Sequence, residues 1–243
     1  SPYTGLTSFG ITNENLGNRF VYASTPSNSS YLASLKKWTI NDQGIVPNSM
    51  EVLVDSDDPI LDPGDFSAYN LEVKTLPNEE DIIAWISASD DSKDKIFIFR
   101  DEDAYAFDLD KGRIGGIEFS DYNPDYLYVS CHTDGLIAIN FYSGQVVQQL
   151  NTSSDYGHTY LQKAPDGHIY GVSNSGHFLG RINQTTGEFE PDVFEMPSLL
   201  DGNIVSAFRV FEEQKFFILP EDSREYNPLT VEIEPTHVSC TGL

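Results

Sequence analysis

Two stretches in the middle of the chain share one pattern. Residues 127–144 read LYVSCHTDGLIAINFYSG, and residues 169–187 read IYGVSNSGHFLGRINQTTG. Each consists of an apolar run, a polar turn, a second apolar run that ends in Ile-Asn, three further residues and then Gly. Asn140 and Asn183 are 43 residues apart. Repeats of this length indicate a fold built from supersecondary units that stack on one another.

Turn chemistry explains the ending that the two stretches share. An apolar residue closes the strand, and the Asn side chain accepts hydrogen bonds from amides of the turn. Gly then takes the positive φ angle that lets the chain reverse. A similar ending occurs upstream as FDLDKG at residues 107–112. We therefore interpret each copy as the end of a strand.

Outside these stretches the apolar residues still fall in short runs or in alternation. The runs are rich in Val, Ile, Phe and Tyr and are bounded by Gly, Pro, Asn and Asp, which is typical of strands and turns. We predict about twenty short strands. At about four strands in each repeat of about 40 residues, the expected fold is an all-β β-propeller with five blades of four antiparallel strands. Six blades and an open arc are the alternatives.

The whole chain, residues 1–243, is predicted to be one propeller domain, because a single blade cannot bury both of its faces. An N-terminal strand is expected to complete the last blade and close the ring. The blades are expected at residues 10–57, 58–103, 104–153, 154–198 and 199–243.

The central repeats resemble propellers of secreted and surface bacterial proteins. In those propellers a strand of the form F-S-P-D-G-K-x-L-Y-V is followed by x-I-x-V-I-D-x-x-T-G. The chain is similar in this respect to YncE-like repeat propellers and to the propellers of surface proteins associated with gliding motility and type IX secretion. The resemblance implies a scaffold or binding domain outside the cytoplasm, and it carries over no catalytic residue. The matching positions run from Phe119 to Val129, Ile139 to Gly144, Pro165 to Val172 and Ile182 to Gly187.

Acidic residues dominate the charge of the chain. It holds 38 Asp and Glu residues against 14 Lys and Arg residues, a formal net charge of −24. Nucleic-acid binding needs clustered Lys and Arg, so we expect no nucleic-acid partner. No apolar run approaches the roughly 20 residues that cross a bilayer, so we expect no insertion into a membrane. The charge favours basic partners or cations instead.

Asp side chains cluster after residue 54, where Pro59, Pro63 and Gly64 can fold the segment back on itself. Ca²⁺ takes six to eight oxygen ligands, which clustered carboxylates and backbone carbonyls can supply. We expect these to be solvated loop acids that keep the protein soluble, with no resident cofactor, and a Ca²⁺ site is the alternative. The candidate ligands are Asp55, Asp57, Asp58, Asp62 and Asp65.

Aromatic residues in the predicted loops are the candidates for ligand contacts. Tyr122, Tyr142 and Tyr156 are predicted to be exposed, where a ring can stack on a sugar or anchor a protein. His158 lies close to Tyr156 in the chain and joins this set. We therefore predict a non-catalytic module that binds a protein or a glycan through propeller loops.

The alternative function is a carbohydrate-active hydrolase or lyase with carboxylates or histidines in the central channel. Glycoside hydrolysis needs two carboxyl groups about 5 to 9.5 Å apart across a pocket. Asp108, Glu118 and Asp166 lie near predicted strand ends. Convergence of such side chains on one pocket would distinguish the enzyme from the binding module.

The chain has two cysteines, Cys131 and Cys240. A disulfide between them would tie the C-terminal segment to the body of the protein. The alternative is a buried thiol at Cys131 and a second thiol near the end of the chain. Because Lys is scarce and Asn, Ser, Thr and Tyr are abundant, we expect a secreted or cell-surface location.

Overall fold

The computed structural model describes residues 8–12, 19–25, 34–55, 60, 65–78, 80–89, 94–157, 159–173 and 178–195. These residues form seventeen β-strands and one short 3-10 helix, and none of them belongs to a helix long and apolar enough to cross a bilayer. The elements are β1 (Ser8–Ile11), β2 (Arg19–Thr25), β3 (Ser34–Asn41), β4 (Gly44–Ile45), β5 (Glu51–Val54), β6 (Asp65–Thr75), β7 (Asp81–Ser89), β8 (Lys95–Arg100), β9 (Asp103–Asp108), β10 (Ile114–Phe119), β11 (Tyr126–Cys131), β12 (Gly135–Asn140), β13 (Val146–Asn151), η1 (Ser154–Tyr156), β14 (Leu161–Lys163), β15 (Ile169–Val172), β16 (Phe178–Ile182) and β17 (Phe189–Glu195).

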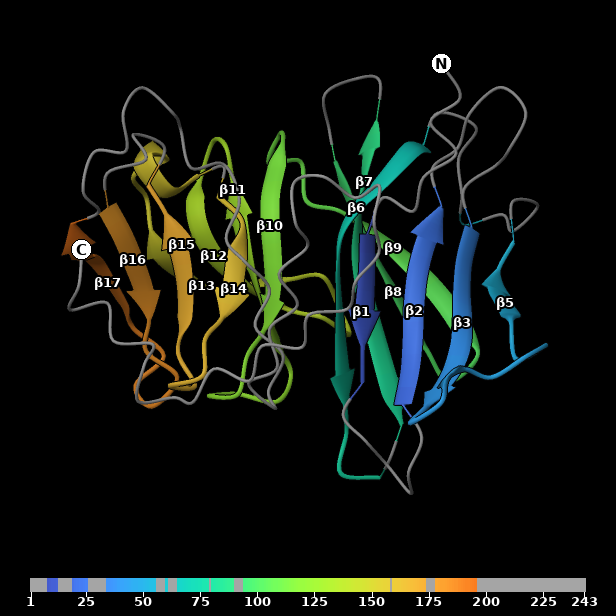
Figure 1. Cartoon of the computed structure of the whole chain (residues 1–243). Coiled ribbons are helices and arrows are strands. Elements are labelled where there is room, and N and C mark those ends of the chain that lie inside the picture. The colour runs from blue at the N-terminus through green and yellow to red at the C-terminus, as the bar shows by residue number, and fades with distance from the viewer. Residues whose placement is uncertain are drawn as a thin grey trace, which may run out of the picture.

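The strands form four antiparallel sheets in chain order. β6–β9, β10–β13 and β14–β17 are four-stranded, and in the sheet of β1–β5 both β4 and β5 pair with β3. The first strands of neighbouring sheets lie against one another, β1 against β6, β6 against β10 and β10 against β14. Figure 1 shows the first two sheets on one side of the molecule and the other two on the opposite side. Sheets that meet in this way are propeller blades, so the predicted all-β propeller fold is confirmed.

We number these sheets as the first to the fourth blade. The fifth predicted unit, residues 199–243, lies outside the described residues. The first unit, expected at residues 10–57, corresponds to β1–β5. The fourth unit, expected at residues 154–198, corresponds to β14–β17. The third unit, expected at residues 104–153, contains β10–β13, but it was also expected to include one strand that belongs to the second blade.

That strand is β9, and the predicted boundary at residues 103 and 104 is wrong. β8 and β9 form a hairpin, with Arg100 opposite Asp103, so β9 is the outer strand of the second blade. The ending at residues 107–112 therefore follows a fourth strand, whereas Asn140 and Asn183 follow third strands. Gly112, Gly144 and Gly187 all have φ near 70°. The same turn chemistry serves both places, which is why the sequence pattern did not separate them.

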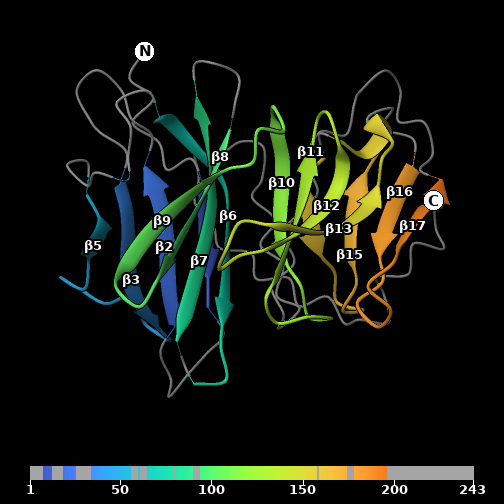
Figure 2. The same ribbon diagram turned by 180° about the vertical axis from the view of Figure 1, so that it is seen from behind.

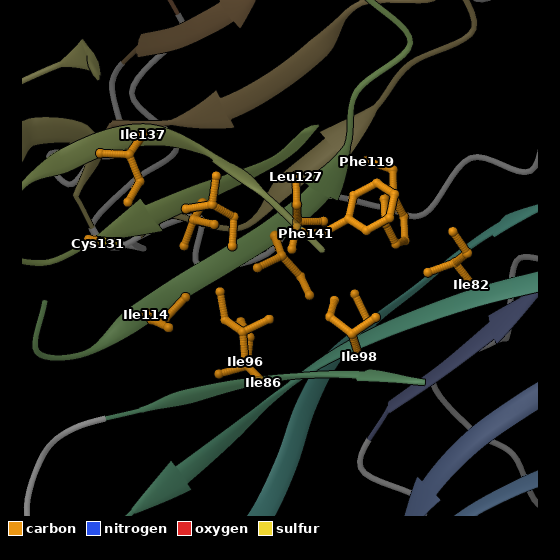
Figure 3. Packing of buried hydrophobic residues seen from close by; sticks show 14 residues of the cluster. Ile82, Ile86, Ile96, Ile98, Ile114, Phe119, Leu127, Cys131, Ile137 and Phe141 are labelled. Atoms are coloured by element: carbon orange, nitrogen blue, oxygen red, sulfur yellow. The ribbon is translucent and has the colours of Figure 1, made fainter. Parts of the chain in front are cut away.

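Alternation of side chains lets each middle strand pack against two neighbours. In β7, Ile82, Ala84 and Ile86 pack with the third blade, whereas Ile83 and Trp85 pack with the first. The core between the second and third blades contains isoleucines from β7, β8, β10 and β12 that point toward one another (Figure 3). Because consecutive residues of a strand face opposite sides, one run of apolar residues supplies both interfaces.

Candidate functional site

The connections between strands lie at two ends of the blades, because successive strands run in opposite directions. The connections after β6, β8, β10, β12, β14 and β16 lie at one end, which we call the hairpin end (Figure 1). Those after β9, β11 and β13 lie at the other, the crossover end. Tyr122 follows β10 and Tyr142 follows β12, so these two predicted ligand-binding residues share the hairpin end. Tyr156 lies in the connection after β13.

Tyr122 is exposed on a loop that the fourth blade holds in place. The residue is 47% exposed, and its ring lies against Gly187 in the connection after β16. The amide groups of Asp121 and Tyr122 donate to Gln184 Oε1 at 2.7 and 3.3 Å. The amide of Gln184 donates to His168 Nδ1 at 3.1 Å. Two turns of the neighbouring blade therefore position the ring.

A lysine of the second blade holds the same loop from the other side. Lys74 Nζ donates to the carbonyl oxygens of Ser120 and Pro124 at 2.8 and 3.1 Å. Burial lowers the pKa of Lys74, and the nearby Asp121 carboxylate opposes that shift. Lys163, at the end of β14, forms an ion pair with Asp121. Three successive blades thus fix the loop that carries Tyr122.

Polar contacts also join the innermost strands. The amide of Ile117 in β10 donates to Asn70 Oδ1 in β6 at 3.1 Å, and the amide of Lys163 donates to Glu118 Oε2 at 3.0 Å. Glu118 is buried, and a hydrogen-bonded carboxylate between blades accounts for that burial. Sequence reasoning missed these partners because they are 47 and 45 residues apart and share no local pattern.

Tyr142 is exposed at the tip of the β12–β13 hairpin, at 43% of its surface. The guanidinium carbon of Arg100, from the end of β8, lies 4.8 Å from the centroid of the Tyr142 ring. Arg100 Nε is 2.7 Å from Glu80 Oε1 and 3.2 Å from Asp101 Oδ2. The hydrogen bond from Arg100 lowers the pKa of the Glu80 carboxyl. Acidic groups of the second blade therefore surround the cation that stacks on this ring.

Two exposed valines follow Tyr142 in the chain. Val146 and Val147, at the start of β13, are 45% and 43% exposed. Gln148 Nε2 donates to the carbonyl oxygen of Gly187 at 3.2 Å, so β13 reaches the turn on which the Tyr122 ring packs. These side chains lie on the third blade at and beside the hairpin end. We call this set the third-blade patch: Tyr122, Tyr142, Val146 and Val147.

Tyr156 is not part of this surface, and the prediction that its side chain is exposed is wrong. Only 2% of the residue is accessible. Its ring packs edge-on against Phe189 with 5.0 Å between centroids, and its hydroxyl donates to Asp192 Oδ1 at 2.7 Å. The short helix η1 turns the side chain into the core between the third and fourth blades. His158 lies outside the described residues.

The proposed calcium ligands are only partly within the described residues. Asp55 is exposed directly after β5, and Asp65 begins β6. The other three candidates, Asp57, Asp58 and Asp62, lie outside the described residues. Within the described ranges, no three or more His, Cys, Asp or Glu side chains are grouped so that they could hold a metal ion. A calcium site after β5 stays a prediction.

Cys131 ends β11 and is completely buried. Burial raises the pKa of its thiol to about 12. Because the thiolate is the nucleophilic form, this thiol is unsuited to covalent catalysis near neutral pH. Cys240 lies outside the described residues, so a disulfide between the two cysteines stays a prediction.

Two of the carboxylates considered for hydrolysis, Asp108 and Asp166, have structural partners and lie apart. Asp108 Oδ1 accepts the amide of Asp110 at 2.8 Å at the crossover end. Asp166, at the hairpin end, accepts the amide of His168 at 3.0 Å and the hydroxyl of Tyr170 at 2.6 Å. These two carboxylates stabilise turns at opposite ends of the blades, so they cannot act on one bond.

Comparison with known proteins yields distant structural likenesses. No family profile and no curated protein matches the chain. Apo AztD from Citrobacter koseri is 12% identical over 73% of this chain, with a TM-score of 0.45, and the chain spans 57% of the length of AztD. The GH43 β-xylosidase/α-arabinofuranosidase CoXyl43 from a compost microbial metagenome is 7% identical over 77% of this chain and 78% of its own, with a TM-score of 0.44. The computationally designed Ika4 protein is 11% identical over 81% and 94%, with a TM-score of 0.42. The sheet topology, rather than these likenesses, defines the fold.

Proposed function

We propose that this chain is a non-catalytic binding module that recognises a protein partner through the third-blade patch. The exposure of Tyr122 and Tyr142 on turns held by neighbouring blades carries this proposal. A ring that is already fixed in place loses little conformational entropy on binding, which favours affinity. Tyrosines in such positions are frequent anchors of protein interfaces.

Two observations favour a protein partner over a glycan. Val146 and Val147 place exposed aliphatic surface beside the hairpin tip, and aliphatic side chains contribute to the apolar centre of protein interfaces. The Tyr142 ring is also partly occupied by Arg100, which leaves less aromatic face for stacking on a sugar. The enzyme alternative has less support, because Asp108, Glu118 and Asp166 each have hydrogen-bond partners within the fold.

The proposal includes a location outside the cytoplasm, no nucleic-acid partner, no insertion into a membrane and no resident cofactor. The composition of the chain and its net charge of −24 support the first three points. Cell fractionation of the native host tests the location. Thermal unfolding with EDTA and then with Ca²⁺ tests the cofactor, because a ligand at 100 times its Kd stabilises the native state by about 2.7 kcal/mol.

The partner class is tested by selecting binders for the whole protein from a displayed polypeptide library and, in parallel, from a glycan array. Selected ligands are then measured against Tyr122→Ala/Tyr142→Ala and against Tyr160→Ala. Tyr160 is the matched control because it is an exposed tyrosine that follows β13, away from the patch. We expect polypeptide ligands that the double variant loses and the control retains. Glycans with that behaviour would overturn the proposed partner class, and ligands unaffected by either change would overturn the proposed surface.

A further inference from the structure

The first and fourth blades form the two ends of the described arc of blades. The main contacts between strands of different sheets join successive blades, and among the described strands none of them joins the fourth blade to the first. Figure 1 shows the first and fourth blades nearer the viewer, and Figure 2 shows the second and third blades in front. Each end blade therefore packs one face on a neighbouring blade. We call the opposite face of each end blade its far face.

The far face of the first blade is largely apolar. Tyr22 in β2 packs in the core with the second blade. Its neighbour Val21 and the residue opposite Val21 in β3, Trp38, point the other way because side chains alternate along a strand. The pairing of β3 with β4 and β5 places Ile45 and Val52 on the same face, where they are 66% and 44% exposed. Among the described strands, the main partner of this blade is β6, which packs on the opposite side.

The far face of the fourth blade carries aromatic rings. Ile182 in β16 packs in the core with the third blade. Its neighbour Arg181 points the other way and lies opposite Tyr170, so both belong to the far face. Phe194 in β17 is 53% exposed, and its ring centroid lies 6.4 Å from that of Tyr170. Because Arg181 forms an ion pair with Glu190, this face offers aromatic surface beside a charge that is already paired.

End faces of this kind need a cover. Stacked repeats bury their faces against neighbours, and terminal repeats stay soluble by presenting a polar outer face. The two far faces carry apolar and aromatic side chains instead, so we expect apolar surface to pack against them. Residues 196–243 lie outside the described residues and follow directly after β17, the outer strand of the fourth blade. The second blade spans residues 65–108, so this stretch is long enough for a blade.

The sequence of this stretch contains what a strand between two blades requires. β8 reads KIFIFR, and its four central residues are buried because alternate side chains pack with the first blade and with the third. Residues 215–220 read KFFILP, again a lysine followed by four apolar residues. A continuous apolar run of this length is consistent with a strand that is buried on both faces. Two further predicted strands, residues 204–211 and 228–233, flank it.

A second copy of the chain is a poorer occupant of the far faces. Each copy carries a net charge of −24, so two copies repel each other, whereas a segment tethered to β17 is held at high effective concentration. We propose that residues 199–243 dock between the far faces of the first and fourth blades, with residues 215–220 as the strand that contacts both. The chain then closes its own ring, and neither far face is available to a binding partner.

Hydrogen exchange of the full chain tests this without any substitution. Amides of residues 216–219 should exchange at least about a hundredfold more slowly than in a short peptide of the same sequence, as expected for a core strand. Residues 96–99 in β8 are the internal reference, because both faces of that strand are buried. Exchange of residues 216–219 at the peptide rate, with slow exchange of residues 96–99, would overturn the proposal.

Trp38 reports on the far face of the first blade. The chain has two tryptophans, so Trp85→Phe leaves Trp38 as the sole one. Ile218 has the position of Ile98 in β8, which packs with the next blade, so its side chain is expected against the first blade. On this background Ile218→Lys should shift Trp38 emission to longer wavelength and increase its quenching by acrylamide. Gln214→Lys adds the same charge before the run and is the matched control, with no change expected.

Slow exchange in residues 96–99 of both lysine variants checks that the described blades remain folded. An unchanged Trp38 signal in Ile218→Lys would contradict the contact with the first blade. Light scattering of the unmodified chain identifies the occupant. A monomer is expected, and a dimer would assign the far faces to a second copy or to a segment exchanged between copies, which would overturn closure within one chain. The Tyr122 and Tyr142 variants test the binding surface separately, so the failure of one proposal leaves the other intact.

Discussion

The ring of Tyr122 in the third blade lies against Gly187 in a turn of the fourth. A Cβ atom on Gly187 would come within 2.6 Å of Tyr122 Cε1, and Gly187 has a φ of 72°. Both the close approach and the left-handed backbone require glycine at this position. The contact links an exposed tyrosine of the patch to the packing between two blades.

Gly187→Ala should therefore cost more stability than an alanine at another left-handed glycine. Gly167 has a φ of 81° with nothing within 4 Å of an added Cβ, so Gly167→Ala changes the backbone preference alone. We expect a loss of about 1 kcal/mol for Gly167→Ala and a further 1–3 kcal/mol, roughly, for Gly187→Ala because the Tyr122 ring must move. Urea denaturation of both variants measures this. Equal losses of unfolding free energy in the two variants would mean that the Tyr122 ring moves aside without cost.

Glu118 should contribute to stability as a hydrogen-bond acceptor between blades. Glu118→Ala leaves the partly buried amide of Lys163 without this acceptor, and we expect a loss of about 1–3 kcal/mol. Glu118→Gln keeps an oxygen at the same place and should lose less. Denaturant unfolding of the two variants distinguishes them. Identical losses would point to the negative charge, rather than the hydrogen bond, as the stabilising feature.

The Cys131 thiol should be unreactive in the folded protein. Its pKa of about 12 leaves almost no thiolate near neutral pH, and its burial blocks access. The Cys240→Ser variant isolates this thiol from any pairing with Cys240. A chromogenic disulfide reagent should label it slowly under native conditions and rapidly in denaturant. Fast labelling of the native variant would contradict the packing between the second and third blades.

Non-reducing peptide mapping of the unmodified chain tests the predicted disulfide between Cys131 and Cys240.

Alkaline pH should destabilise the propeller through the buried Tyr156 and the half-buried Tyr170. Burial raises the pKa of Tyr156 and also that of Tyr170, in the latter case to about 12. A tyrosine in the unfolded chain ionises near pH 10. Because the pKa values of these tyrosines are higher in the folded protein, their protonated side chains stabilise it fully below about pH 10. This stabilisation is lost as the pH rises through the folded pKa values. Denaturation across this range measures the loss. Tyr156→Phe should flatten the pH dependence, and an unchanged slope would contradict this assignment.

Local patterns were sufficient to predict strands, turns and the repeat. The alternation in β7 and β8 predicts side chains on two faces, and the Asn140 and Asn183 endings mark real turns in which the side chain accepts amide hydrogen bonds. The same patterns misplaced β9, because the Asp and Gly of a turn have the same pattern after the third strand of a blade as after the fourth. The position of a strand within its blade depends on pairing, which a local pattern does not contain.

Exposure of the tyrosines was predictable only in part. Tyr122 and Tyr142 are exposed as their loop positions suggest, but Tyr156 occupies an equally polar stretch and is buried. Its burial depends on Phe189 and Asp192, which lie more than thirty residues further along the chain. The contacts of Lys74 with the Tyr122 loop span 46 and 50 residues and were equally hidden.

The sequence by itself determined an acidic all-β chain of stacked repeats, because strand periodicity, turn residues and charge are properties of neighbouring residues. Only the tertiary structure decided which tyrosines remain exposed and which carboxylates are held between blades. Those features depend on side chains from different blades that meet only after the sheets have packed around the inner strands. The candidate binding surface belongs to this second group, because the second and fourth blades both hold the loop of the third.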